Sequence, residues 1–166
     1  DMGLGKTVQV LAHLQRLHVL DRETPRRPSL VVAPRSLIYN WLAEAARFTP
    51  KLRVLDYTGA QRGDRLHDVT DCDVVVTTYG TVRRDITDLR EMEFDHVILD
   101  EAQAIKNPSA QSSKACRLLH GRRRIALSGT PVENDASELW SIFEFLNPRM
   151  LGSRREFQNL IRADGE

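Results

Sequence analysis

Short, unbroken runs of apolar and β-branched residues recur along this chain, and longer segments with helical spacing separate them. We interpret the runs as buried strands at 29–33, 73–78, 94–100 and 124–128, with a weaker strand at 52–57. Apolar residues at helical spacing predict helices at 5–20, 37–48, 80–90, 109–119 and 139–146, a short polar helix at 60–68 and a last helical segment around 157–161. Such alternation is typical of an α/β fold, in which helices cover both faces of a mostly parallel sheet.

Size and composition fit a single globular domain. The chain has 166 residues, of which 41% are hydrophobic and 28% charged, and its formal net charge is +1. No stretch approaches the ~20 apolar residues of a membrane span, so we expect no membrane partner. A balanced charge does not by itself indicate nucleic-acid binding. Cys72 and Cys116 lack metal-ligand spacing, and we expect them to be buried or incidental thiols.

The first residues form the end of a phosphate-binding loop of the form G-x-x-x-x-G-K-S/T. Gly5, Lys6 and Thr7 occupy its last three positions, and Gly3 and Leu4 precede them. Lys6 would reach the β- and γ-phosphates of a nucleotide, and the Thr7 hydroxyl would ligate Mg²⁺. The first loop position would fall before the first residue, so we expect the first strand and the start of the loop to be missing. The alternative is a glycine-rich turn that Lys-Thr follows by chance.

Two adjacent carboxylates, Asp100 and Glu101, follow the apolar run 94–99. Burying them is costly unless they serve a cation or a proton transfer. In a chain with a phosphate loop, we expect Asp100 to hold Mg²⁺, directly or through water. We expect Glu101 to orient and polarise the attacking water. The alternative is a helix N-terminus, which favours acidic residues.

A second polar segment, Ser128-Gly129-Thr130, follows the run 124–127. Ligands gather at the carboxyl ends of the strands in a parallel sheet. Hydroxyls and a glycine at such a position can sense whether the γ-phosphate is present and pass this to neighbouring elements. The alternative is a plain turn.

Five segments resemble known helicase motifs. Motifs I, Ia, Ib, II and III are matched in this order by Asp1–Thr7, Val31–Trp41, Val75–Tyr79, Ile98–Asn107 and Leu127–Asn134, and Leu139–Pro148 adds a further likeness. They resemble the Swi/Snf-type branch of superfamily-two helicase-like ATPases. The resemblance implies that residues 1–166 form the N-terminal RecA-like ATP-binding lobe, a three-layer αβα domain of the P-loop NTPase class. It also implies that the second lobe is absent from this sequence.

The same resemblance implies roles for individual residues. ATP and Mg²⁺ would be bound by Gly3, Leu4, Gly5, Lys6 and Thr7. Hydrolysis would depend on Lys6, Asp100, Glu101 and Gln103, the last standing where many relatives have His. Hydrolysis would be coupled to motion by Ser128, Gly129 and Thr130.

Five further residues would touch the phosphates of one DNA strand by the same resemblance: Pro34, Arg35, Ser36, Thr77 and Thr78. Hydroxyls and backbone N–H groups at strand ends suit this task, because phosphate contacts position a protein without reading sequence. The alternative is that these residues are helix caps and strand terminators. Ser36, for example, also offers an N-cap for the predicted helix 37–48.

The leading hypothesis is therefore a DNA-dependent ATPase, similar to chromatin remodellers, that uses ATP and Mg²⁺ to move on double-stranded DNA without separating the strands. The rival hypotheses are a strand-separating DNA or RNA helicase and, for the isolated chain, a non-catalytic domain that binds nucleic acid or a partner. The resemblance implies that the second lobe supplies an arginine to the transition state, so we expect residues 1–166 alone to be inactive. We expect an intracellular location: the cytoplasm or nucleoid of a bacterium, or the nucleus of a eukaryote.

Overall fold

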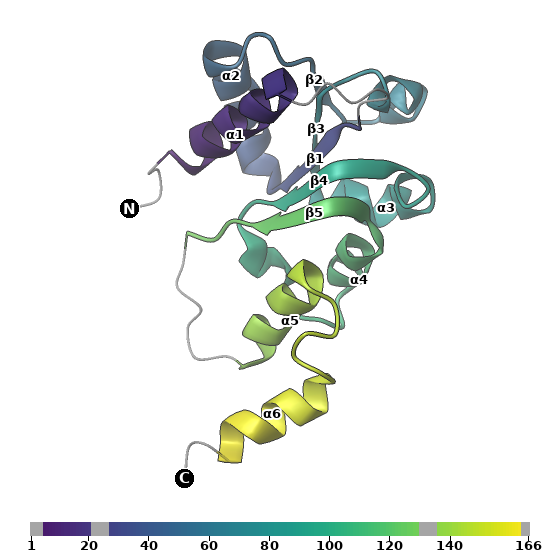
Figure 1. Cartoon of the computed structure of the whole chain (residues 1–166). Coiled ribbons are helices and arrows are strands. Elements are labelled where there is room, and N and C mark those ends of the chain that lie inside the picture. Colours follow the sequence, from purple (N-terminus) through teal and green to yellow (C-terminus); the bar gives the residue numbers. More distant parts are fainter. Residues whose placement is uncertain (1–4, 21–26, 130–135, 164–166) are drawn as a thin grey trace.

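Five strands form one sheet, and every neighbouring pair of strands is parallel. The computed structural model describes residues 5–20, 27–129 and 136–163. The strands are β1 (Ser29–Ala33), β2 (Val54–Asp56), β3 (Val74–Thr78), β4 (Glu93–Leu99) and β5 (His120–Ala126). Their order in the sheet is β2-β3-β1-β4-β5, with β1 in the centre (Figure 1). The predicted parallel α/β sheet is confirmed.

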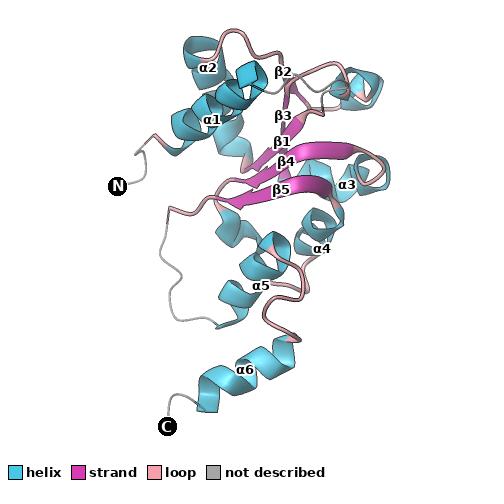
Figure 2. Ribbon diagram, in the orientation of Figure 1, coloured by secondary structure: helices cyan, strands magenta, loops and turns pink. Residues whose placement is uncertain are grey.

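Helices cover both faces of this sheet, which gives the three layers (Figure 2). The helices are α1 (Lys6–Leu20), α2 (Ile38–Phe48), α3 (Tyr79–Leu89), α4 (Gln111–Leu118), α5 (Ala136–Leu146) and α6 (Arg154–Ala163). One apolar cluster joins α1 and α2 to one face, and a second cluster joins α3, α4 and α5 to the other. The last helix, α6, extends away from the sheet beyond α5.

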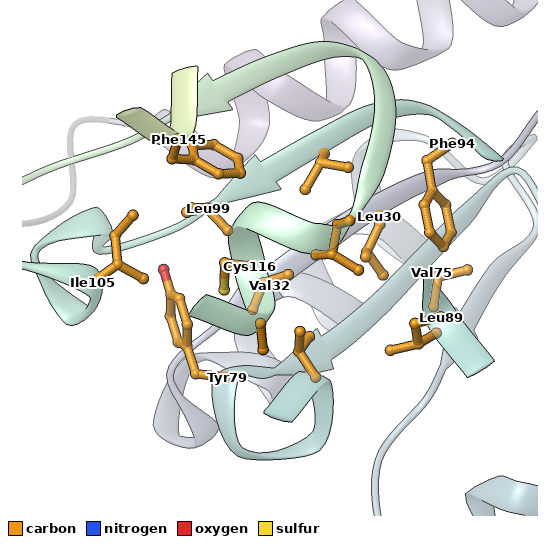
Figure 3. Close-up of a cluster of buried hydrophobic side chains, with 14 of the residues drawn as sticks. Leu30, Val32, Val75, Tyr79, Leu89, Phe94, Leu99, Ile105, Cys116 and Phe145 are labelled. Atoms are coloured by element: carbon orange, nitrogen blue, oxygen red, sulfur yellow. The ribbon is translucent and has the colours of Figure 1, made fainter. Parts of the chain in front are cut away.

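The central strand explains why two cores exist. All five residues of β1 are buried, and successive side chains point to opposite faces of the sheet. Leu30 and Val32 enter the cluster under α3 to α5, which Figure 3 shows, and Val31 and Ala33 enter the cluster under α1 and α2. An apolar run without alternation is therefore what this position in a doubly covered sheet requires.

The structure corrects the predicted elements in three places. The polar helix expected at 60–68 is two short 3₁₀ helices, Gln61–Arg65 and His67–Val69. Strand β5 starts at His120 rather than at 124, because it pairs along β4 from Glu93 onward although its first residues are polar. Gly121 allows this pairing, since a Cβ there would lie 2.7 Å from the Val97 side chain. Ser36 does not cap α2: it lies in the 3₁₀ helix Arg35–Leu37, and Leu37 is the N-cap residue.

Arg124 of β5 ties the ends of two helices to the sheet. Its guanidinium donates hydrogen bonds to the carbonyls of Phe145 at 2.7 Å, Leu119 at 2.8 Å and Arg117 at 3.3 Å. These carbonyls lie in the last turns of α5 and α4 or, for Leu119, directly after α4, where a cation is favourable. The guanidinium also lies 5.0 Å from the centroid of the Phe145 ring. Burial lowers the pKa of Arg124 from its ordinary value, so the three carbonyl bonds offset a desolvation cost.

Candidate functional site

Parallel strands place their carboxyl ends at one edge of the sheet, and four polar segments follow these ends. Pro34–Ser36 follows β1, Thr78 ends β3, Asp100 and Glu101 follow β4, and Ser128 and Gly129 follow β5. The start of α1 joins the same edge through the contact described next. Gly3, Leu4 and Thr130, which we predicted to take part, lie outside the described residues.

Lys6 at the start of α1 contacts Glu101 at the end of β4. The Lys6 ammonium lies 3.2 Å from Oε1 of Glu101, although the two residues are 95 positions apart in the sequence. Gly5 has φ +70°, a conformation that favours glycine, and its carbonyl accepts the amide of Gln9 at 2.9 Å to begin the helix. The contact brings the end of the predicted phosphate loop beside the predicted acidic pair.

Glu101 is held in place from two sides. Its Oε2 accepts a hydrogen bond from the Gln103 amide, while Oε1 faces Lys6. The bond from Gln103 is the largest cause that lowers the pKa of Glu101 below its ordinary value of 4.5, and Lys6 lowers it further. The carboxylate is therefore ionised at neutral pH, as a group that polarises water must be.

Gln103 extends these contacts to the end of β5. Its Oε1 accepts a hydrogen bond from the Ser128 hydroxyl at 3.4 Å. The backbone reinforces this link, because the Ala102 amide donates to the Leu127 carbonyl at 2.8 Å. Gly129 lies against both charged groups: a Cβ there would come 3.1 Å from the Lys6 ammonium and 3.4 Å from Oε1 of Glu101. Three predicted segments are thus continuous in space.

Asp100 is buried, and both of its carboxylate oxygens accept hydrogen bonds. Only 4% of the residue is exposed. Oδ1 accepts the Glu101 amide at 2.9 Å, and Oδ2 accepts the indole N–H of Trp41 at 2.8 Å. The Tyr79 hydroxyl donates to the Asp100 carbonyl at 2.8 Å, and the Asp100 amide donates to the carbonyl of Val32 at 2.8 Å. Residues of α2, α3 and β1, together with the neighbouring Glu101 amide, therefore fix this residue.

Two residues that donate hydrogen bonds to Asp100, Trp41 and Tyr79, were not predicted from the sequence. Both lie within segments that carry the helicase resemblance, and both have an apolar body with a polar tip. Such residues need a hydrogen-bond partner when they are buried. The sequence could therefore have predicted that each polar tip is hydrogen-bonded, but the identity of the partner depends on the tertiary fold.

The donor atoms at this edge fit Mg²⁺. The Asp100 carboxylate oxygens each retain a lone pair beyond the hydrogen bonds they accept. Thr7, which follows Lys6 directly in the sequence, carries a hydroxyl that could serve as a second ligand. Within residues 5–20, 27–129 and 136–163, no group of three or more His, Cys, Asp or Glu side chains forms a complete metal cage. Mg²⁺ suits such a site, because it binds through one or two carboxylates together with water and substrate phosphates.

The five residues predicted to touch DNA phosphates differ in their accessibility. Arg35 and Ser36 are exposed, and Pro34 is half-buried. Thr77 is fully buried, and its hydroxyl donates to the Tyr57 carbonyl at 2.7 Å. Thr78 is half-buried and accepts the Thr81 amide at 3.1 Å, which caps α3. Internal hydrogen bonds therefore occupy both threonine hydroxyls.

The parallel sheet with two helical layers, together with its likeness to solved SWI2/SNF2 ATPase cores, places the chain in the RecA-like class of α/β proteins. The family follows from comparison of sequences: the chain belongs to the SNF2-related domain family, whose profile matches residues 1–166. The Swi/Snf-type resemblance of the motifs is thereby confirmed.

Relatives and solved structures agree with this assignment. The chain is 43% identical over 160 residues to YwqA of Bacillus subtilis (strain 168), which covers 95% of this chain. It is 37% identical over 178 residues to the chromatin-remodeling ATPase INO80 of Kluyveromyces lactis, which covers 100% of this chain. The solved SWI2/SNF2 ATPase core of Sulfolobus solfataricus in complex with dsDNA covers 96% of this chain at 42% identity, with a TM-score of 0.86.

The chain spans only a small part of these proteins. It covers 17% of YwqA, 12% of the Kluyveromyces INO80 and 32% of the solved Sulfolobus chain. None of the helices in the described ranges combines the length and the apolar character that a bilayer span requires.

Proposed function

We propose that this chain is the first of two RecA-like lobes of a motor that hydrolyses ATP to move along double-stranded DNA. The observation that carries the proposal is the contact between Lys6 and Glu101 beside the buried Asp100. It unites the end of a phosphate loop with a water-activating and a metal-binding carboxylate. The family membership supports the same function, as does the likeness to the Sulfolobus ATPase core, which was solved in complex with dsDNA.

In the proposed mechanism, the described residues share three tasks. The amide groups at the start of α1, together with Lys6, bind the β- and γ-phosphates, so that the ammonium exchanges Glu101 for phosphate oxygens. Thr7 and Asp100 would hold Mg²⁺, which would supply neutralisation of charge on the phosphates. Glu101, ionised and oriented by Gln103, then positions the attacking water.

The hydrogen bond between Gln103 and Ser128 is the proposed route by which the presence or absence of the γ-phosphate changes the position of other parts of the motor. A change in the position of Glu101 alters the bond that Gln103 makes, and Gln103 in turn contacts the segment after β5. The exposed Arg35 and Ser36 offer groups for DNA phosphates at the same edge. In this proposal a second lobe closes over this edge. The motor acts in the compartment that contains the DNA, the nucleoid of a bacterium or the nucleus of a eukaryote.

The experiment is to measure the ATPase rate of the two-lobed protein with and without duplex DNA. We expect duplex DNA to raise the rate and Lys6→Ala to abolish it. Lys114→Ala, which removes an exposed lysine on α4, is the matched control and should behave as wild type. Equal rates with and without DNA would reject the coupling, and an unaffected Lys6→Ala variant would reject the ATP site.

Strand separation is the second candidate, because one relative that is 36% identical over 166 residues, from Mycoplasma pneumoniae, is named an ATP-dependent helicase. Release of a labelled strand from a duplex discriminates the two candidates. We expect no release during ATP turnover, while a third strand annealed to the duplex is displaced as the motor passes. Release of a duplex strand would favour the helicase.

A further inference from the structure

Trp41 is buried and its polar atom points at the Asp100 carboxylate. The side chain is 0% exposed and belongs to the apolar cluster under α1 and α2, yet its indole N–H lies 2.8 Å from Oδ2 of Asp100. The rest of the ring packs among aliphatic side chains such as Ile38 and Ala45. An aliphatic or phenyl side chain could fill the same apolar space, so packing alone does not explain why an N–H donor is present.

The chemistry of this bond is directional. An indole N–H can only donate, and a carboxylate oxygen can only accept. With Oδ1 engaged by the Glu101 amide and Oδ2 by Trp41, rotation of the carboxylate about its Cβ–Cγ bond breaks both hydrogen bonds. Groups that orient a metal ligand in this way commonly change metal affinity by about 10–100-fold when they are removed.

We propose that Trp41 is a positioning residue for the metal site: its indole N–H fixes the Asp100 carboxylate in the orientation that holds Mg²⁺. The inference rests on the proposed function, because it assumes that Asp100 binds the metal of a bound nucleotide. It adds a residue that the helicase motifs do not assign to metal binding. Trp41 acts through Asp100 and does not itself contact nucleotide or metal.

Tyr79 provides a matched comparison within the same site. Its buried hydroxyl donates to the main-chain carbonyl of Asp100 at 2.8 Å, equal in length to the Trp41 bond, but it does not contact the carboxylate. Tyr79→Phe therefore removes a hydrogen bond of similar burial from the same residue and leaves the orientation of the carboxylate intact. A general loosening of Asp100 would appear in both variants, whereas loss of ligand orientation would appear only at Trp41.

The experiment compares Trp41→Phe, Tyr79→Phe and wild type in the two-lobed protein. A third variant carries the tryptophan analogue benzothienylalanine at position 41, which keeps the shape of the ring and lacks the N–H. Two quantities are measured: the affinity for Mn²⁺ in the presence of a non-hydrolysable ATP analogue, by electron paramagnetic resonance, and the Mg²⁺ concentration that gives half-maximal ATP turnover.

We expect both Trp41 variants to weaken Mn²⁺ binding and to raise the half-maximal Mg²⁺ concentration by about 10-fold. Saturating Mg²⁺ should restore most of the turnover, and nucleotide affinity without metal should stay unchanged. Tyr79→Phe should remain within about twofold of wild type. The inference is overturned if the benzothienylalanine variant matches wild type, or if Tyr79→Phe shifts the metal dependence as strongly. A wild-type protein that binds no nucleotide would instead reject the proposed function itself.

Discussion

Glu101 occupies a backbone conformation that few residues other than glycine adopt. Its φ is 50° and its ψ is 58°, in the left-handed region, directly between β4 and the 3₁₀ helix Ala102–Ile105. Such a conformation costs on the order of 1–3 kcal/mol and persists where the surrounding structure enforces it. Here it turns the carboxylate toward Lys6 and Gln103. The strained backbone of Glu101 is therefore what allows its ionised side chain to contact Lys6 and Gln103.

The role of Glu101 leads to a prediction for Glu101→Gln. An amide cannot polarise water as a carboxylate does, so ATP turnover in the two-lobed protein should fall by about 100-fold or more. Binding of a fluorescent ATP analogue should change by no more than a few-fold. The pKa of Glu101 lies below its ordinary value of 4.5 in the nucleotide-free protein, so the carboxylate is already ionised when ATP arrives at neutral pH.

The control for this variant is Glu91→Gln, which changes a side chain that is 73% exposed. It should match wild type in both assays. Turnover by Glu101→Gln at the wild-type rate would remove Glu101 from the mechanism.

At the scale of single residues, the sequence indicated that Lys6 and Glu101 would lie close together, but not which side chains would bond to Asp100. Lys6 and Glu101 could be named because their side chains carry recognisable chemistry at recognisable spacing, and Gln103 could be named only through the resemblance to a helicase motif. The role of Trp41 could not, because a helical apolar stripe shows that the ring is buried and not what its N–H meets. Thr77 is a similar case, since only the fold shows that its hydroxyl bonds the Tyr57 carbonyl.

Among the elements, α3 is joined to the segment after β2 by an ion pair. Arg62 donates to Asp85 through Nε at 2.6 Å and Nη2 at 2.8 Å, and its Nη1 donates to the Gly59 carbonyl at 2.6 Å. Both side chains are mostly buried, at 17% and 14% exposure. Asp85 interrupts the helical backbone of α3, with φ −105° and ψ 17°. The pair therefore holds a loop against an irregular point in the helix.

This pair makes stability depend on pH in a predictable direction. The hydrogen bonds from Arg62 lower the pKa of Asp85 below its ordinary value of 3.8. A lowered folded-state pKa stabilises the fold above that ordinary value, and the contribution disappears as the pH falls through the folded-state pKa. Asp85→Asn should therefore lower the free energy of urea unfolding by about 1–3 kcal/mol at pH 7.

The difference between Asp85→Asn and wild type should shrink below pH 3.8, where Asp85 of the unfolded chain becomes protonated, and should disappear once the folded protein is protonated as well. Asp88→Asn, an exposed change on the same helix, is the control and should have little effect. A difference that is constant from pH 7 to pH 3 would contradict the ionic origin of the contribution.

The three hydrogen bonds from Arg124 to helix-end carbonyls lead to a prediction about the packing of helices on the sheet. Arg124→Met keeps a long side chain but leaves three carbonyls without their charged donor. We expect the free energy of unfolding to fall by about 2–4 kcal/mol. The neighbouring Arg123→Met, at a side chain that is 55% exposed, should cost at most about 1 kcal/mol. Equal losses from the two variants would show that the buried carbonyl bonds are not the cause.

Buried elements could be predicted from the sequence more accurately than exposed ones. Strands β1, β3 and β4 lie inside the sheet and could be read from continuous apolar runs. The first half of β5 could not, because it lies at an edge of the sheet and its residues His120 to Arg123 are polar. Backbone pairing with β4, rather than side-chain burial, defines that part of the strand. The short 3₁₀ helices after β2 likewise lack an apolar stripe long enough to reveal their geometry.

At the scale of the whole molecule, the proposed site is an edge rather than an enclosed cavity. Every described group that would act on ATP comes from one lobe, and the resemblance to Swi/Snf-type ATPases implies that a second lobe contributes an arginine. We expect residues 1–166 alone to bind Mg·ATP weakly and to hydrolyse it at less than about 1% of the rate of the two-lobed protein. Calorimetry and a phosphate-release assay measure the two quantities. Turnover at the rate of the two-lobed protein would disprove the need for the second lobe.

The order of the strands is the part of the fold that the sequence could not supply. Alternating strands and helices predict a parallel sheet, but many orders satisfy that pattern. The observed order places β1 beside β3 and β4 and leaves β2 at an edge. This choice depends on which apolar faces pack best together, which no local pattern reveals. The site depends on it, since β1 and β4 carry the segments that meet at Asp100.

The central position of β1 also has a consequence for folding during synthesis on the ribosome. Leu30 to Ala33 are synthesised before their pairing partners at Val74–Thr78 and Val97–Leu99. A nascent chain therefore carries a fully apolar strand with both edges unpaired until many further residues have been synthesised, a state prone to aggregation. We expect molecular chaperones to hold this segment during translation, and the polar segments at the carboxyl edge of the sheet to come together only late in folding.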